Sequence, residues 1–265
     1  MSTSYFLSPH VHLCVAGKQV VLLDLERDKY LAVAHEHPLG RWVRGWPAIA
    51  PGPDQIEGVL GAAAAGEMAA RSEVPAAGSG APVAPAGEGA ENRLLSKMLA
   101  QRLLVTDPAL GKIAAPIVAD EAKVALLEPQ LHDQLHATGG QFCNLLRAHA
   151  LAKWSLKRRP IKEVVEAARL RKKRTSTAAT LDIERVRLLV RAFFYLRPLF
   201  YTAHNACLLD SLTLTRFLAL YGVFPDWVFG VKTDPFYAHC WVQQDGYVFN
   251  DSPDYVGEFA PILVV

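Results

Sequence analysis

The sequence lacks several features that would assign a class of protein at once. Lys and Arg exceed Asp and Glu by only two, 28 against 26, and the formal net charge of +2 gives no reason to expect nucleic acid as a partner. It has no run of about eighteen apolar residues, so membrane insertion is not expected. The chain does not begin with a basic segment followed by an apolar one, so the predicted compartment is the cytoplasm.

The chain has only four cysteines, and their spacing argues against two common roles. None stands in a zinc-like pair, and no disulfide framework is evident, which suits a reducing compartment. His10 and His12 share one face of a predicted strand with Cys14, but this alternation alone is weak evidence, and no metal site is predicted. The four are Cys14, Cys143, Cys207 and Cys240.

The composition is that of an ordinary soluble protein. A hydrophobic share of 51% with 20% charged residues is typical of globular chains, and 265 residues are comfortable for two domains. We predict an α+β chain with a first domain at 1–108 and a second at 118–265. Residues 72–89, rich in Ala, Gly and Pro, are predicted to be a flexible insertion within the first domain.

The second domain contains a candidate nucleophile at the start of a predicted helix. Apolar residues recur at helical spacing after Cys207, and Gly222 ends the run. The free N–H groups and positive dipole end of a helix N-terminus favour a thiolate and can hold an oxyanion. Asn205 is expected to cap this helix, whereas His204 either caps it or faces the cleft. The apolar positions are Leu208, Leu212, Phe217, Leu218 and Tyr221.

A predicted hairpin supplies a base and a carboxylate. Residues 236–242 are dense in aromatic and β-branched types, Asp245–Gly246 is a turn signal, and residues 247–251 form the returning strand. This places His239 and Asp251 roughly opposite each other, within reach of a hydrogen bond. With a cysteine, they complete the set needed for nucleophilic catalysis.

Each of these three residues also has a purely structural interpretation. Cys207 alone is explained as an inert core residue, His239 as a satisfied strand residue and Asp251 as a turn former. The joint pattern, a cysteine on a helix start with histidine and aspartate facing across one hairpin, favours the catalytic interpretation.

The motifs resemble those of the B proteins of lasso peptide biosynthesis, whose C-terminal part is a transglutaminase-like leader peptidase. The resemblance rests on Ala-Cys-Leu around Cys207, Ala-His-Cys-Trp-Val around His239, Phe-Asn-Asp ending at Asp251, and Phe-Ala-Pro-Ile at 259–262. It implies that Cys207, His239 and Asp251 are the catalytic triad of a papain- or transglutaminase-like fold. Where such proteins commonly carry Glu after the Trp-Val pair, this chain has Gln243.

The first domain also resembles a known module. Four short β-rich runs predict a small meander. Residues 21–31 look like the start of a precursor-recognition domain, a winged-helix-like fold of three strands and three helices that binds leader peptides. The runs are 5–7, 10–15, 20–25 and 29–33, and the expected helices lie near 35–43, 53–64 and 91–103.

In the related modules the leader adds as a strand beside the third strand and lies against the third helix. Carried onto this chain, the resemblance places a peptide groove between residues 29–33 and 95–102. The alternative is that these apolar positions only form the core of a small domain. The peptide-binding candidates are Lys29, Tyr30, Leu31, Val33, Leu95, Met98, Leu99 and Arg102.

Helices are expected to lead into the catalytic core. Basic residues at 153–159 and 169–174 surround a predicted helix at 161–170, and a solvated surface helix explains them, with contact to an acidic partner or precursor segment as the alternative. Another helix is predicted at 181–196, ending before Pro198 and packing against the helix that starts at Cys207.

The resemblance implies a cysteine endopeptidase that removes the leader of a lasso peptide precursor and passes the freed amine to a macrolactam synthetase partner. No cofactor is expected, and the sequence does not determine whether ATP has an influence. Two alternatives stay open: acyl transfer by the same triad, as in transglutaminases, and a leader-binding scaffold without catalysis.

Overall fold

The computed structural model describes the protein in two compact units. The first comprises residues 1–117 with 231–236, and the second 118–230 with 237–265. The described residues are 4–35, 37–47, 88–127, 137–175, 182–201 and 206–265.

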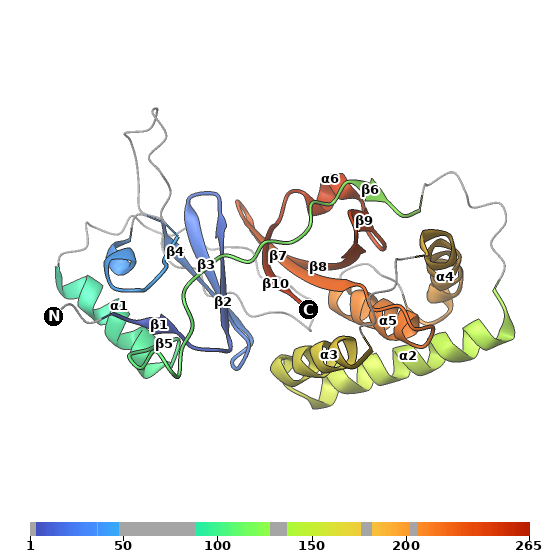
Figure 1. The fold of residues 1–265 in the computed structure, drawn as a ribbon, viewed down its shortest axis with the longest axis horizontal. Helices are drawn as coiled ribbons and strands as arrows, with labels where there is room; N and C mark the ends of the chain where they lie inside the picture. Colours follow the sequence, from blue (N-terminus) through green and yellow to red (C-terminus); the bar gives the residue numbers. More distant parts are fainter. Residues whose placement is uncertain (1–3, 36, 48–87, 128–136, 176–181, 202–205) are drawn as a thin grey trace. The chain divides into compact units, whose positions relative to one another are not determined.

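The first unit is built on the predicted antiparallel meander (Figure 1). Strands β2 (Val11–Ala16), β3 (Gln19–Asp24) and β4 (Lys29–Ala34) pair in that order, so β4 lies at an edge of this sheet. The first β-rich run was predicted to belong to the meander, but it does not join it. It forms β1 (Phe6–Leu7), which pairs with β5 (Leu104–Val105), because the chain after the long helix returns beside it.

Helix α1 (Glu88–Ala100) covers one face of this meander and confirms the predicted third helix. Its apolar side chains Leu95 and Met98 enter the same core as Leu22 and Val33 of the sheet. Arg102 follows with a positive φ of 55°, and this tight turn directs the chain into β5.

The other two predicted helices have different outcomes. The helix expected near 35–43 is only a single 3-10 turn, η1 (Pro38–Arg41), because Gly40 disfavours a longer helix and the chain then pairs at Val43 with Tyr5. The helix expected near 53–64 and residues 72–87 of the proposed insertion lie outside the described residues, whereas residues 88–89 begin α1. The winged-helix description therefore stays a prediction.

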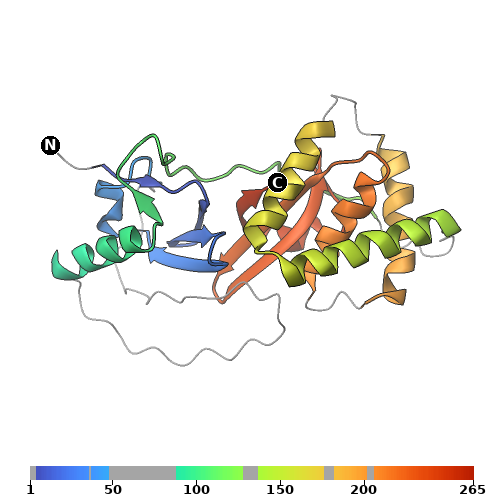
Figure 2. The same cartoon turned by 90° about the horizontal axis from the view of Figure 1, so that it is seen from below.

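In the second unit, four α-helices follow the first strand in the part of the chain that the structure describes. Thr138 caps α2 through a reciprocal capping box with Gln141. Helices α2 and α4 both contact α5, which therefore lies between apolar partners (Figure 2). The helices predicted at 161–170 and 181–196 are confirmed, the first being longer than expected. They are α2 (Gly139–Arg158), α3 (Ile161–Thr175), α4 (Ile183–Leu196) and α5 (Cys207–Ala219).

A five-stranded mixed sheet completes the second unit in the order β10-β7-β8-β9-β6. Asp245 and Gly246 have positive φ angles of 51° and 81° and form the predicted hairpin turn. The returning strand covers two residues instead of the predicted five. The remaining elements are β6 (Val124–Ala125), β7 (Asp226–Thr233), β8 (Phe236–Gln244), β9 (Tyr247–Val248), α6 (Pro253–Val256) and β10 (Ala260–Val264).

The core of this sheet forms around Trp241. It packs with Val228 and Phe259, and a Cβ at Gly230 would lie 2.8 Å from both the Trp241 ring and Phe259. Position 230 therefore requires glycine, because any larger side chain would clash with Trp241 and Phe259. Among the described helices, none combines the length and the apolar character that a bilayer span requires.

Candidate active site

Cys207 is the first residue of α5 and is partly buried. The preceding cap residue, Ala206, makes no side-chain hydrogen bond to the helix. Among the described residues, no side-chain cap is seen at the first N–H groups of α5, the helix that Cys207 begins. His204 and Asn205, considered as cap or cleft residues, lie outside the described residues.

His239 and Asp251 come together as the hairpin prediction expected. His239 is on β8, and its Nε2 lies 2.6 Å from Asp251 Oδ2 in the segment after β9. The other carboxylate oxygen, Oδ1, accepts the backbone N–H of Ser252 at 2.9 Å. Trp241 and Phe259 lie near the imidazole, with ring centroids 6.1 and 5.3 Å away, and fix its orientation.

The pKa values of Cys207 and His239 favour an ion pair. A hydrogen bond with the Cys240 thiol, opposed by burial and assisted by the hydrogen bond and charge of His239, lowers the pKa of Cys207 from 9.0 to about 5. Burial alone would lower the pKa of His239, but hydrogen bonds with Asp251 and Cys207 raise it from 6.5 to about 9. Because Nε2 faces Asp251, Nδ1 is the ring nitrogen available for proton transfer with the Cys207 sulfur.

Cys240 and Ser211 lie behind the nucleophile, and the sequence reasoning gave them no role. Cys240 Sγ lies 3.3 Å from Ser211 Oγ, which donates to the carbonyl of Cys207 at 2.7 Å and accepts from Trp227 Nε1 at 2.8 Å. Burial, followed by the nearby Cys207, raises the pKa of Cys240 well above its ordinary value. Cys240 thus stays a thiol and donates to the thiolate.

A second missed group centres on Asp210, which is buried one turn into α5. Its Oδ1 accepts from Arg197 Nη1 at 3.1 Å and from Tyr201 Oη at 2.9 Å, and its Oδ2 accepts from Asn250 Nδ2 at 3.1 Å. Asn250 Oδ1 in turn accepts the backbone N–H of Val242 at 2.8 Å. The network therefore ties the residue before Asp251 both to the cysteine helix and to the histidine strand.

Gln243, the departure from the usual Glu, has a structural reason. Its side chain is buried, its Oε1 accepts from Trp241 Nε1 at 2.6 Å, and its Nε2 donates to the carbonyl of Asp120 at 2.7 Å. An amide can both donate and accept, whereas a carboxylate can only accept. Glutamine therefore satisfies both neighbours without placing a charge in the core.

In the first unit, four of the eight peptide-binding candidates line one groove. Lys29, Tyr30 and Leu31 of β4 and Met98 of α1 line a cavity of about 190 Å³, with Lys29 and Leu31 on one face of the strand and the Tyr30 ring turned toward Phe236. The other four do not line it. Val33 and Leu95 belong to the core, Leu99 packs against that core, and Arg102 is exposed.

The predicted basic surface is partly engaged with neighbouring groups. Lys172 pairs with Asp226, and Arg159 lies 5.0 Å from the ring centre of Trp154. His10, considered for a metal site, lies 3.6 Å from Asp24. No group of three or more His, Cys, Asp or Glu side chains suited to a metal occurs among the residues that the structure describes.

Comparison with known proteins gives two partial matches. Residues 145–264 match the family model of the transglutaminase-like superfamily, and this segment contains Cys207, His239 and Asp251. The chain is 44% identical over 48 residues to the microcin J25-processing protein McjB of Escherichia coli, a match that covers 18% of this chain and 23% of that protein. No solved structure matches. The second unit of this protein therefore contains a transglutaminase-like domain.

Proposed function

We propose that the protein is a cysteine peptidase that removes the leader from a lasso peptide precursor. The observation that carries the proposal is the contact of His239 with Asp251, 2.6 Å between Nε2 and Oδ2, beside a cysteine whose pKa is lowered to about 5. The partial similarity to a protein named for processing microcin J25 supports the class of substrate.

In the acylation step, the Cys207 thiolate attacks the carbonyl carbon of the last leader residue. The resulting oxyanion accepts hydrogen bonds from N–H groups at the start of α5. His239 then gives its Nδ1 proton to the departing amine of the core peptide. The leader remains bound to Cys207 as a thioester.

In the deacylation step, His239 is neutral and acts as a base. It takes a proton from water, and the hydroxide formed attacks the thioester carbonyl. The Cys207 thiolate then leaves, and His239 keeps the proton. Asp251 holds the imidazole orientation and stabilises its charged form throughout. The chemistry needs no cofactor.

The first unit supplies leader recognition in this proposal. Its β4 edge and the neighbouring groove suit an extended peptide that adds as a strand. Binding the leader there raises the local concentration of the scissile bond, so the cleft itself needs little selectivity. The freed core amine would then pass to a macrolactam synthetase.

One experiment separates this function from its two rivals. The protein is incubated with the precursor peptide encoded beside its gene, and the products are weighed by mass spectrometry. A free leader and a core with a new amino terminus support the peptidase. An acylated or cross-linked product supports a transferase, and binding without mass change supports a scaffold. Cys207→Ala is the control, and cleavage at the wild-type rate by this variant excludes the proposed nucleophile.

A further inference from the structure

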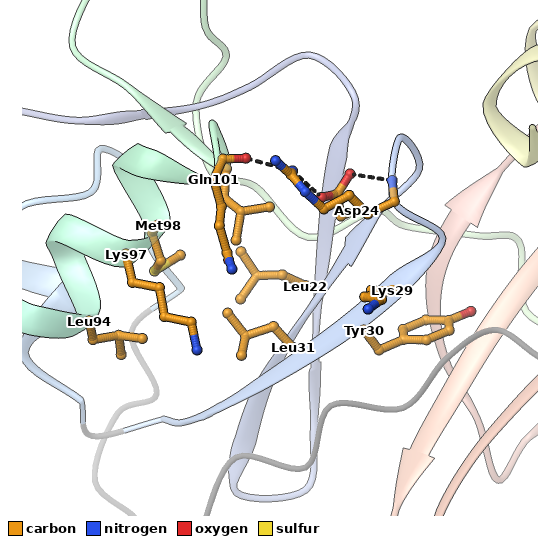
Figure 3. A pocket seen from close by; sticks show the side chains of 11 residues that line it. Leu22, Asp24, Lys29, Tyr30, Leu31, Leu94, Lys97, Met98 and Gln101 are labelled. Carbon is orange, nitrogen blue, oxygen red and sulfur yellow. Dashed lines mark hydrogen bonds and ion pairs between the residues drawn. The ribbon is translucent and has the colours of Figure 1, made fainter.

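The groove between β4 and α1 has an apolar floor and a basic rim (Figure 3). The floor is made by Leu22, Met98 and Leu103, which are buried. Leu31 of β4 and Leu94 of α1 lie on opposite sides of it and are only partly buried, and Figure 3 shows the Lys97 side chain extending between them. An apolar side chain of a bound segment would gain contacts here that water does not provide.

Three cations and one carboxylate stand at the rim of the groove. Asp24 is already satisfied, because it pairs with Arg27 at 2.9 Å and accepts the backbone N–H of Glu26. Arg27 is engaged as well, since its Nη1 also donates to the carbonyl of Gln101 at 2.6 Å. The local charge is therefore set by the two remaining cations.

Those two cations are Lys29 and Lys97, and both are exposed. Neither ammonium group makes an ion pair or hydrogen bond with the part of the chain that the structure describes. Lys29 is two residues before Leu31 on β4, and Lys97 is three residues after Leu94 on α1. Each lysine thus lies on the same face of its element as one of these leucines.

We propose that this groove selects a peptide segment that carries an Asp or Glu two residues from an apolar side chain. A segment paired with the edge of β4, which no strand of the described residues occupies, presents alternate residues to the same face, and its spacing matches that of Lys29 and Leu31. The apolar side chain packs against Leu31 and Leu94, and the carboxylate pairs with Lys29 and Lys97, whose exposed side chains can turn toward it. This specificity deepens the leader-docking part of the proposed function.

The test selects binders from a displayed library of random short peptides with the full chain carrying Cys207→Ala. Binders count as groove ligands only if Leu94→Glu, which places a carboxylate at the groove wall, abolishes their binding. The selection is repeated with the double variant Lys29→Gln/Lys97→Gln. The matched control is Lys153→Gln/Lys157→Gln, which removes the same charge from exposed positions of α2.

The expected result is enrichment of acidic residues two positions from an apolar one. The double groove variant should lose the acidic preference but keep the apolar one, and should bind the selected acidic peptides about two- to thirtyfold more weakly, the effect of two exposed ion pairs. The α2 control should match the parent. Groove ligands without an acidic preference, or a preference unchanged in the double variant, overturn the proposal, as does a failure to select any groove ligand.

The outcome is separable from that of the cleavage assay. The selection uses a protein without its nucleophile, so it reports docking alone. A protein that cleaves its precursor but shows no acidic preference refutes the inference and leaves the peptidase proposal standing. A protein that shows the acidic preference but does not cleave its precursor supports the inference about the groove and refutes the peptidase proposal.

Discussion

The sulfur of Cys207 and the imidazole of His239 hold opposite charges over a defined range of pH. The pKa of the thiol is lowered to about 5 and that of the imidazole is raised to about 9, so both are ionised between these values. Leader cleavage should therefore rise as pH increases through about 5, when the thiolate forms, and fall through about 9, when His239 loses the proton that the leaving amine needs. A pH profile of kcat/KM for precursor cleavage measures both limbs, and a rate still rising above pH 9 would contradict the ion pair.

Alkylation by iodoacetamide tests the thiolate without any substrate. We expect the alkylation rate of Cys207 to increase through about pH 5, and we expect His239→Ala to move that midpoint upward because the imidazolium no longer stabilises the thiolate. Peptide mapping by mass spectrometry follows Cys207 separately from Cys143. A wild-type midpoint near the free-cysteine value of about 8.5 would be inconsistent with the proposed site.

Gln243→Glu should restore the residue usual in the resembled family and still destabilise this protein. The carboxylate can accept from Trp241 but cannot donate to the carbonyl of Asp120, and it brings a charge into a buried position. The expected loss in free energy of unfolding is about 1–3 kcal/mol. Urea unfolding of Gln243→Glu beside the uncharged Gln243→Met measures it, and equal or greater stability of the Glu variant would show that the donor is not needed.

Helix α5 and the segment after β9 act together because the side chain of Asn250 connects them. Removing this side chain in Asn250→Ala breaks bonds to Val242 and Asp210, so Asp251 should hold His239 less firmly. The expected results are a loss of about 1–2 kcal/mol in stability and an upward shift of the Cys207 alkylation midpoint.

The matched control for this variant is Asn144→Ala. Asn144 donates to the hydroxyl of Tyr221 at 3.0 Å, a single side-chain hydrogen bond between α2 and the residues after α5. Asn144→Ala removes one hydrogen bond where Asn250→Ala removes two, so it should lower the free energy of unfolding by a smaller amount and leave the Cys207 alkylation midpoint unchanged. If both variants shift the midpoint equally, Asn250 has only a structural role.

Local patterns were sufficient to predict the elements that carry the three candidate catalytic residues. The Asp-Gly pair at 245–246 specifies a tight hairpin, and the apolar spacing after Cys207 specifies a helix. The length of β9 was overestimated because Asn250 replaces a ladder bond with its side chain, an exchange that no period-two pattern reveals.

The Asp210 network could not be predicted because its partners are distant in sequence. Arg197, Tyr201 and Asn250 lie 13, 9 and 40 positions away, and only the tertiary fold brings them to one carboxylate. A weak signal existed, since Asp210 interrupts an apolar helix face one turn after the candidate nucleophile. Charged residues are rarely buried without such partners.

The whole molecule combines a proposed docking unit with a proposed catalytic unit in one chain. If the first unit binds the leader, a short peptide that contains only the residues around the cut should be cleaved with a similar kcat but a KM raised about 10²- to 10⁴-fold, because tethering no longer concentrates the scissile bond. Steady-state kinetics on the short and full-length substrates measure this ratio. Equal KM values would place all recognition in the cleft.

The four cysteines differ in burial and pKa, so Cys207 can be labelled selectively in the unmodified protein. Cys14 and Cys240 are buried, and burial raises their pKa values, that of Cys14 to about 12, so neither forms a thiolate at neutral pH. Cys143 is exposed, and Cys207 alone combines partial access with a strongly lowered pKa. A dilute fluorescent electrophile applied at mildly acidic pH should therefore mark one sulfur per molecule. Protection of that sulfur by added peptides then provides an occupancy assay for the cleft, with no need for a cysteine-free background.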